Sequence, residues 1–178
     1  YESRVRVVRG ELAEARNLLD RASNRLARDG APALKARVQM DLGSLHWHAG
    51  AFEAAGRCYE HSLAAARSAG MKRDLARSLV GRAVVRIATG GLSRAEDELR
   101  EAAAIYLTIG DLDGQWHAFL NLADILRHRA RFKEALALLL KGVNERESIS
   151  PMRYAFLVLN AAEIETEMFQ LGRARERL

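Results

Sequence analysis

The chain has 178 residues and a mass of 19.8 kDa, and its content of 49% hydrophobic and 29% charged residues is that of a soluble globular protein of about one domain. This composition, with only two prolines, argues against a disordered tail. No apolar run approaches the roughly 18 to 20 residues that a membrane-spanning helix needs. Residues 1–9 lack the layout of a signal peptide, so we expect a soluble, cytoplasmic protein.

Arginine dominates the charged residues. Lysine and arginine together number 28, of which only four are lysines, against 23 acidic residues, so the net charge is +5 and the pI is about 9.8. A basic chain can bind an anionic partner, but acidic residues are interleaved with the arginines almost everywhere. The arginine triplets within 127–131 and 173–177 alternate around a turn or helix and have no stacking aromatics between them. We therefore do not expect this protein to bind nucleic acid.

Residues for catalysis are missing from the sequence. The single cysteine, Cys58, excludes an internal disulfide and a multi-cysteine metal site, and with only Arg57 beside it and no paired histidine we expect an inert thiol. No glycine-rich phosphate loop, Gly-x-Ser-x-Gly elbow or His-Glu-x-x-His pair is present. We therefore predict no catalytic residues, no cofactor and no enzymatic activity.

A forty-residue period runs through the first 150 residues without a gap. Glycine-type residues occupy two columns, which hold Gly10, Gly50, Gly90 and Ala130, and Gly30, Gly70, Gly110 and Ser150. Three more columns hold apolar or small residues: Leu12, Phe52, Leu92 and Phe132; Ala15, Ala55, Ala95 and Ala135; and Leu19, Tyr59, Leu99 and Leu139. Self-similarity at a fixed period indicates a repeat protein.

The segments between the glycines are predicted helices, because their apolar residues recur at spacings of three and four. In chain order, residues 1–9 resemble the end of a first helix, and the unit 1–30 closes with a second. The units 31–70, 71–110 and 111–150 each hold two helices joined by a tight turn. The unit 151–178 starts another pair whose second helix opens at 172–178. Because both ends are incomplete, we expect a fragment of a longer protein.

Small residues mark where the two helices of each pair approach one another. The alanine column follows each turn directly, where a larger side chain would push antiparallel helices apart. The last unit is less regular, because Gly172 lies 42 rather than 40 residues after Ala130.

Two stretches carry a resemblance to a known family. They read Leu42-Gly43-x-x-His46 followed by Gly50-x-Phe52-x-x-Ala55-x-x-x-Tyr59-x-x-Ser62, and Asn121-Leu122-Ala123-x-x-Leu126 followed by Phe132-x-x-Ala135-x-x-x-Leu139-x-x-Gly142. By these residues the chain resembles the tetratricopeptide repeat (TPR) family rather than armadillo or HEAT arrays. It departs from the common 34-residue repeat by six extra residues per unit and by lacking the proline that ends the second helix. Such forty-residue units resemble those of Leu-Gly-Asn-repeat polarity adaptors and of sensor arrays in bacterial signalling ATPases and transcription regulators.

The resemblance implies an all-α fold, a right-handed α-solenoid of antiparallel helix pairs with about four repeats and incomplete ends, forming a single domain over residues 1–178. It also implies that the first helix of each pair lines a concave groove in which partners bind. On these helices, residues spaced four, three and four apart fall within an arc of about 60°. The predicted groove residues are Arg37, Asp41, Ser44 and His48; Arg77, followed by Gly81, Val84 and Ala88; and His117, Asn121, Asp124 and His128.

Arg37, Arg77 and His117 would form a positive ladder that suits a carboxylate, because arginine donates two parallel hydrogen bonds. The residues from Gly81 to Ala88 would leave an apolar patch in its middle. The alternative, that these side chains are ordinary solvated helix surface, stays open.

Histidines and tryptophans lie near the same stripes. His117 and Asn121, or Asp124 and His128, are one turn apart, but a zinc site needs three or four converging ligands, so we expect no metal. His46 occupies the column of Leu126 and is expected to pack, whereas His61 is expected to be surface. For Trp47 and Trp116, packing between repeats is favoured over an aromatic wall for a ligand.

The expected function is that of a scaffold that binds a protein or peptide segment, acidic by preference, or another domain of the same chain, in the concave groove. The alternative is a regulatory or ligand-sensing repeat domain of a larger bacterial signalling protein or transcription regulator.

Overall fold

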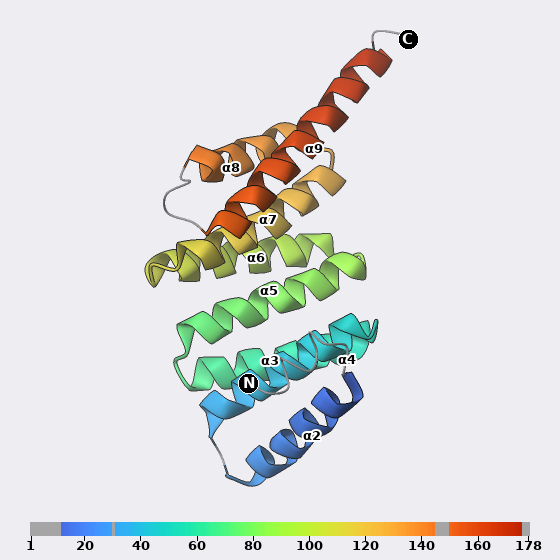
Figure 1. The fold of residues 1–178 in the computed structure, drawn as a ribbon. Helices are drawn as coiled ribbons and strands as arrows, with labels where there is room; N and C mark the ends of the chain where they lie inside the picture. Colours follow the sequence, from blue (N-terminus) through green and yellow to red (C-terminus); the bar gives the residue numbers. More distant parts are fainter. Residues whose placement is uncertain (1–11, 30, 145–149, 176–178) are drawn as a thin grey trace. The chain divides into compact units, whose positions relative to one another are not determined.

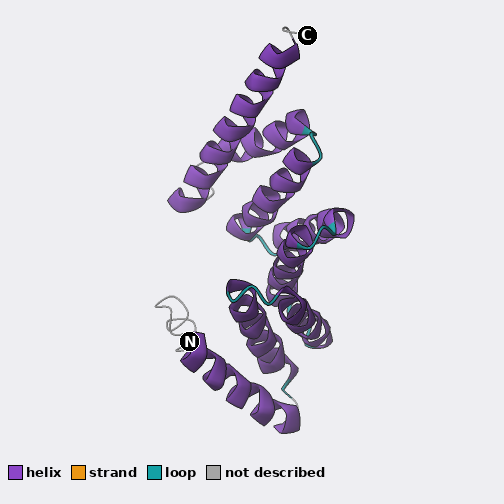
Figure 2. Ribbon diagram, turned by 90° about the vertical axis from the view of Figure 1, so that its right-hand side faces the viewer, coloured by secondary structure: helices purple, strands orange, loops and turns teal. Residues whose placement is uncertain are grey.

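The computed structural model describes residues 12–29, 31–144 and 150–175, and every regular element in these ranges is an α-helix (Figures 1 and 2). The helices are α2 (Leu12–Asp29), α3 (Pro32–His48), α4 (Phe52–Ser68), α5 (Lys72–Ala88), α6 (Leu92–Thr108), α7 (Leu112–His128), α8 (Phe132–Asn144) and α9 (Pro151–Arg175). The helix end predicted at 1–9, the breaks at Gly10 and Gly30 and residues 176–178 lie outside the described residues. The prediction that a second helix of the last unit opens at Gly172 is wrong, because α9 runs through this position as one helix from Pro151 to Arg175.

The helices start at intervals of twenty residues from Leu12 to Phe132, and from α3 to α8 each is separated from the next by three residues. The middle residue of each connection has a left-handed backbone: φ is 71° at Gly50, 65° at Gly70, 84° at Gly90, 68° at Gly110 and 56° at Ala130. The N–H of the following residue bonds to the carbonyl five residues back, at 2.7 to 2.9 Å in all five connections. This is the Schellman cap, which favours glycine at its left-handed position. The predicted breaks in this part of the chain are therefore confirmed as five turns of one geometry.

Ala130 is the single position of the five where a Cβ is forced into the left-handed region. We expect Ala130→Gly to raise the free energy of unfolding by about 0.5 to 1 kcal/mol, because relief of the Cβ clash exceeds the extra chain entropy that glycine loses on folding. Urea unfolding followed by circular dichroism measures the change. The mirror-image control, Gly110→Ala, should lower the stability by a similar amount. An Ala130→Gly variant that is less stable than the parent would contradict the assigned turn.

The chain divides into two compact units, residues 1–98 and residues 99–178. In the first unit α2 packs on α3, α3 on α4 and α4 on α5, and α3 also contacts α5. In the second unit α7 packs on α8 and α8 on α9, and α7 also contacts α9. Within each unit, therefore, the first helices of consecutive pairs lie side by side.

The small residues that were predicted at the helix contacts are fully buried. Ala15, Ala55, Ala95 and Ala135 each have 0% of their surface exposed, which confirms that this column permits the close approach of paired helices. A second column of small residues, Ser62, Ala102 and Gly142, is buried as well. Close-packed interiors leave no room for a longer side chain at such positions.

Tyr59 of α4 is wedged between two glycines of its neighbours. A Cβ added to Gly43 of α3 would lie 2.9 Å from the Tyr59 ring, and one added to Gly81 of α5 would lie 2.4 Å from it. Burial of the ring, as the largest cause, raises the pKa of Tyr59 to about 12. Gly81 is thus a packing residue beneath an aromatic ring. The apolar patch predicted from Gly81 to Ala88 stays a prediction; Gly81 is half-buried and has the Tyr59 ring of the preceding helix against it.

Trp116 of α7 fills the core of the second unit with only 1% of its surface exposed. A Cβ added to Gly142 of α8 would lie 2.9 Å from its ring, so the absence of a side chain there makes room for the indole. One and two repeats earlier, the column of Trp116 holds the buried Ala76 and Ala36. The predicted packing role of Trp116 is confirmed. Trp47 is half-buried and packs against Phe52, with ring centroids 5.1 Å apart.

A buried ion cluster joins α5 to α6 within the first unit. Glu98 Oε1 lies 2.8 Å from Arg82 Nη2 and accepts a hydrogen bond of 2.9 Å from Arg86 Nε, and only 10% of the Glu98 side chain is exposed. One repeat earlier, Leu42 stands in the column of Arg82, and Cys58 stands in the column of Glu98. Leu42 is buried there, with Cys58 packed against its cluster. One helix pair has therefore exchanged an apolar contact for a charged one.

Replacing Glu98 alone by leucine should lower the free energy of unfolding by about 2 to 4 kcal/mol, because Arg82 is left buried without its carboxylate. The double change Arg82→Leu with Glu98→Leu should regain most of this loss, since it restores the apolar pair of the preceding repeat and leaves Arg86 able to reach water. Chemical denaturation of the two variants measures both values. A double variant as unstable as the single one would show that the ion cluster itself holds α6 on α5.

Candidate functional site

The predicted groove residues share one pattern of exposure on all three helices. On α3 the stripe begins with the exposed Arg37 and ends with the exposed His48, with Asp41 and Ser44 half-buried between them. The equivalent stripes, Arg77 to Ala88 on α5 and His117 to His128 on α7, are likewise exposed at both ends and half-buried in the middle. A repeated accessible stripe is compatible with partner binding and with solvated surface, so the groove assignment stays a prediction.

An ion pair brings Arg37 of α3 onto α5. Arg37 Nε donates a hydrogen bond of 3.3 Å to Asp74 Oδ2, and the Arg37 side chain stays 62% exposed while that of Asp74 is only 8% exposed. Because residues three apart are neighbours on a helix surface, Asp74 and Arg77 lie on the same side of α5. The pair thus anchors the Arg37 guanidinium one helical turn from Arg77. The two arginines therefore lie close together, with the Asp74 carboxylate bonded to one of them and Asp41 one helical turn from Arg37 on α3.

The stripe on α7 has a different electrostatic character. Asp124 accepts a hydrogen bond of 2.8 Å from Arg127 Nη2 and lies 3.6 Å from His128 Nε2, while Arg127 Nη1 bonds to Glu167 of α9 at 2.9 Å. The hydrogen bonds from Asp124 and Glu167 raise the pKa of Arg127. Asn121 Nδ2 donates to the carbonyl of His117 on its own helix at 2.8 Å. Polar side chains of this stripe therefore already bond to other groups of the second unit.

Histidine and cysteine chemistry is weak in both units. In residues 12–29, 31–144 and 150–175, no group of three or more His, Cys, Asp and Glu side chains could hold a metal ion. His46 is half-buried, and burial together with Arg16 and Arg57 lowers its pKa, so its ring is neutral at pH 7. Burial also raises the pKa of the half-buried Cys58 thiol, which disfavours the reactive thiolate.

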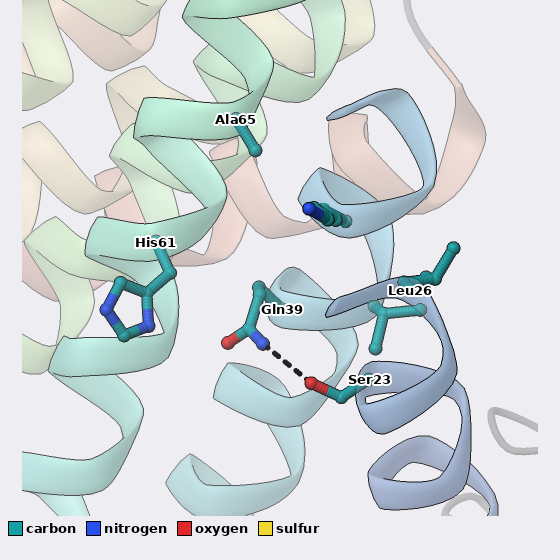
Figure 3. Close-up of a pocket in the computed structure, with 7 residues that line it drawn as sticks. Ser23, Leu26, Gln39, His61 and Ala65 are labelled. Carbon is teal, nitrogen blue, oxygen red and sulfur yellow. Dashed lines mark hydrogen bonds between the residues drawn. The ribbon is translucent and has the colours of Figure 1, made fainter. Parts of the chain in front are cut away.

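The first unit also contains a pocket at the junction of three helices. It has a volume of about 350 Å³ and is lined by Ser23 and Leu26 of α2, Lys35, Val38 and Gln39 of α3, and His61 and Ala65 of α4. Figure 3 shows Gln39 between His61 and Ser23, and Gln39 Nε2 donates a hydrogen bond of 3.2 Å to Ser23 Oγ. None of these residues belongs to the predicted groove, and His61, expected to be plain surface, lines the pocket. A pocket of this volume is large enough for a small ligand.

The sequence carried a signal for this pocket. Ser23, Lys35 and Gln39 stand in the columns of Leu63, Leu75 and Leu79, one repeat later. Each of the three is polar where the following repeat has leucine, which interrupts the helical apolar pattern at the contact of two repeats. A comparison of these positions between the two consecutive repeats, rather than of the groove stripes, would have found them.

Known proteins resemble this chain in fold. Residues 34–108 match the family described as the tetratricopeptide repeat. The structure of BtubC (BKLC) from P. vanneervenii has a TM-score of 0.82 at 17% identity and covers 98% of this chain and 73% of its own. The nearly identical TPR-like repeats of a Podosopora anserina protein, assigned as a kinesin light chain, have a TM-score of 0.77 at 17% identity and cover 98% and 87%. A search of curated proteins found no match.

These likenesses confirm the predicted fold class, an all-α TPR-like solenoid of helix pairs. At 17% identity the two structures show the fold alone. Proteins with tetratricopeptide repeats are typically scaffolds for protein–protein interaction. Among the residues that the structure describes, no helix has the length and apolar character needed to cross a membrane.

Proposed function

We propose that this protein is a scaffold that binds an acidic peptide segment of another protein, or of another domain of its own chain, on the surface of α3 and α5. The observation that carries the proposal is the ion pair between Arg37 of α3 and Asp74 of α5. It holds the Arg37 guanidinium against α5, one helical turn from Arg77. Arginine donates bidentate hydrogen bonds to carboxylates, so two exposed guanidinium groups at one place favour an acidic partner.

We expect this surface to bind a peptide well because its side chains are already held in place before the peptide binds. The guanidinium of Arg37 is already held by a buried carboxylate, so less side-chain entropy is lost when a peptide binds. Arg77 is exposed, so its guanidinium can reach a bound peptide. The two helices are each capped by a Schellman turn and pack directly on one another, which holds the two side chains on a rigid base.

Arg77→Ala is the variant that tests the surface. It should weaken binding at least tenfold without lowering the melting temperature, because Arg77 supports no other side chain. The probe is a set of random 12-residue peptides selected by display on the parent protein, and we expect the selected peptides to be net acidic. Fluorescence anisotropy with one labelled peptide then compares the parent with the variant.

Arg57→Ala on α4 is the matched control, because it removes one exposed arginine of the same unit outside the stripes. Arg37 is unsuitable as a first variant, since its loss would leave the buried Asp74 unpaired and would lower stability as well as binding. Selected peptides that are neutral or basic, or that bind Arg77→Ala as tightly as the parent, would overturn the proposal.

A second candidate function is a regulatory repeat domain that responds to a small effector, as expected for sensor arrays. The pocket of about 350 Å³ at α2, α3 and α4 favours it, because that volume lies in the range of small-molecule sites. A thermal-shift screen against sugars, amino acids and organic acids should reveal at least one compound that raises the melting temperature in proportion to the logarithm of its concentration. If no compound stabilises the protein, this candidate fails while peptide binding is untouched.

A further inference from the structure

The pocket at α2, α3 and α4 has polar residues at three positions that leucine occupies in the next repeat. One repeat later, the columns of Ser23 and Gln39 hold Leu63 and Leu79, with 2% and 0% of their surface exposed. The column of Lys35 holds the half-buried Leu75. The equivalent contact in the next repeat is therefore closed by leucines. Shorter or polar side chains at these positions bury less apolar surface than three leucines do. A ligand that occupies the space would bury apolar surface there again.

The polar groups of the pocket are mostly hydrogen-bond donors. Ser23 Oγ accepts its hydrogen bond from Gln39, so the serine proton remains free to donate. Lys35 adds an ammonium group with three donors, and His61 adds a ring N–H. Among the described lining residues there is no carboxylate, and the Gln39 carbonyl is a hydrogen-bond acceptor. This set of groups suits an anion of single charge that also offers an amide N–H or hydroxyl to Gln39.

The remaining lining is apolar and comes from all three helices, with Leu26 on α2, Val38 on α3 and Ala65 on α4. An inorganic anion would leave these side chains uncovered. A ligand that joins a carboxylate to a short branched hydrocarbon would pair with Lys35 and cover the apolar side chains, in effect replacing the leucines that this repeat lacks.

We propose that the pocket formed by α2, α3 and α4 binds a small aliphatic carboxylate, with its carboxylate on Lys35 and its hydrocarbon on Leu26, Val38 and Ala65. The inference deepens the second candidate function and rests on it, since it names the chemistry of the effector. It is independent of peptide binding on α3 and α5.

Isothermal titration with N-acetyl-leucine tests the proposal, because this compound carries a carboxylate, an isobutyl group and an amide. N-acetyl-leucinamide keeps the shape without the charge and should bind at least tenfold more weakly. Lys35→Gln should weaken N-acetyl-leucine to the same extent. The matched control, Lys72→Gln, removes an exposed lysine from α5 of the same unit and should leave binding unchanged.

A pocket-filling variant separates ligand binding from a purely structural role. The double change Ser23→Leu with Gln39→Leu introduces the residues of the next repeat, so it should raise the melting temperature and abolish binding of N-acetyl-leucine together. A polar cluster that only stabilised the fold would give a lower melting temperature in this variant. Should the double variant fail to fold, Lys35→Gln still decides the question.

Four outcomes would overturn the proposal: equal binding of the acid and its amide, tighter binding of inorganic phosphate than of the acid, an unchanged affinity in Lys35→Gln, or no binding of the acid at all. If the thermal-shift screen yields an uncharged compound that the pocket-filling variant no longer binds, the carboxylate inference fails while the effector function stands. If neither the screen nor the acid gives binding, both fail.

Discussion

The close contact of antiparallel helices at fully buried alanines is the constraint on which the rest of the structure depends. Ala15, Ala55, Ala95 and Ala135 have no exposed surface, and each lies in the first turn of its helix. Close packing there requires the turn before it to have a fixed geometry, and Schellman caps supply it before Ala55, Ala95 and Ala135. The forty-residue interval between these alanines follows from this combination of turn and contact, because any insertion would move the next alanine off the interface.

The backbone arrangement is the same in each repeat, but the side chains at the helix contacts differ in charge and size. Leu42 and Cys58 give way to Arg82 and Glu98 in the next helix pair, and Trp116 occupies the column of two buried alanines because Gly142 has no side chain. An exchange of this kind lowers the stability of the fold where charges are buried. It also means that one helix pair cannot pack well in the place of another. Repeats that share a backbone therefore differ in the side chains at their helix contacts.

The two surfaces proposed for binding follow the same principle. On α3 and α5 the backbone repeat places two arginines at equivalent positions, and a buried carboxylate joins one to the neighbouring helix. At the contact of α2, α3 and α4, a pocket is lined by three polar residues at positions where the next repeat has leucine. Both features are departures in side chain rather than in fold. The fold that this chain shares with BtubC (BKLC) and with the Podosopora anserina repeats therefore says little about its partner.

The sequence alone determined the period, the helices and their turns, because these depend on local properties: helical spacing of apolar residues, glycine at left-handed positions and alanine beside each turn. It also placed the groove stripes on one face of each helix, since a face follows from the pitch of the helix. Only the tertiary structure decided that Asp74 holds Arg37, that the ring of Tyr59 covers Gly81, and that Ser23, Lys35 and His61 meet around one hollow. In each case the partners come from different helices, 12 or more residues apart in the chain. Their meeting depends on how neighbouring helices pack, which no local pattern of residues specifies.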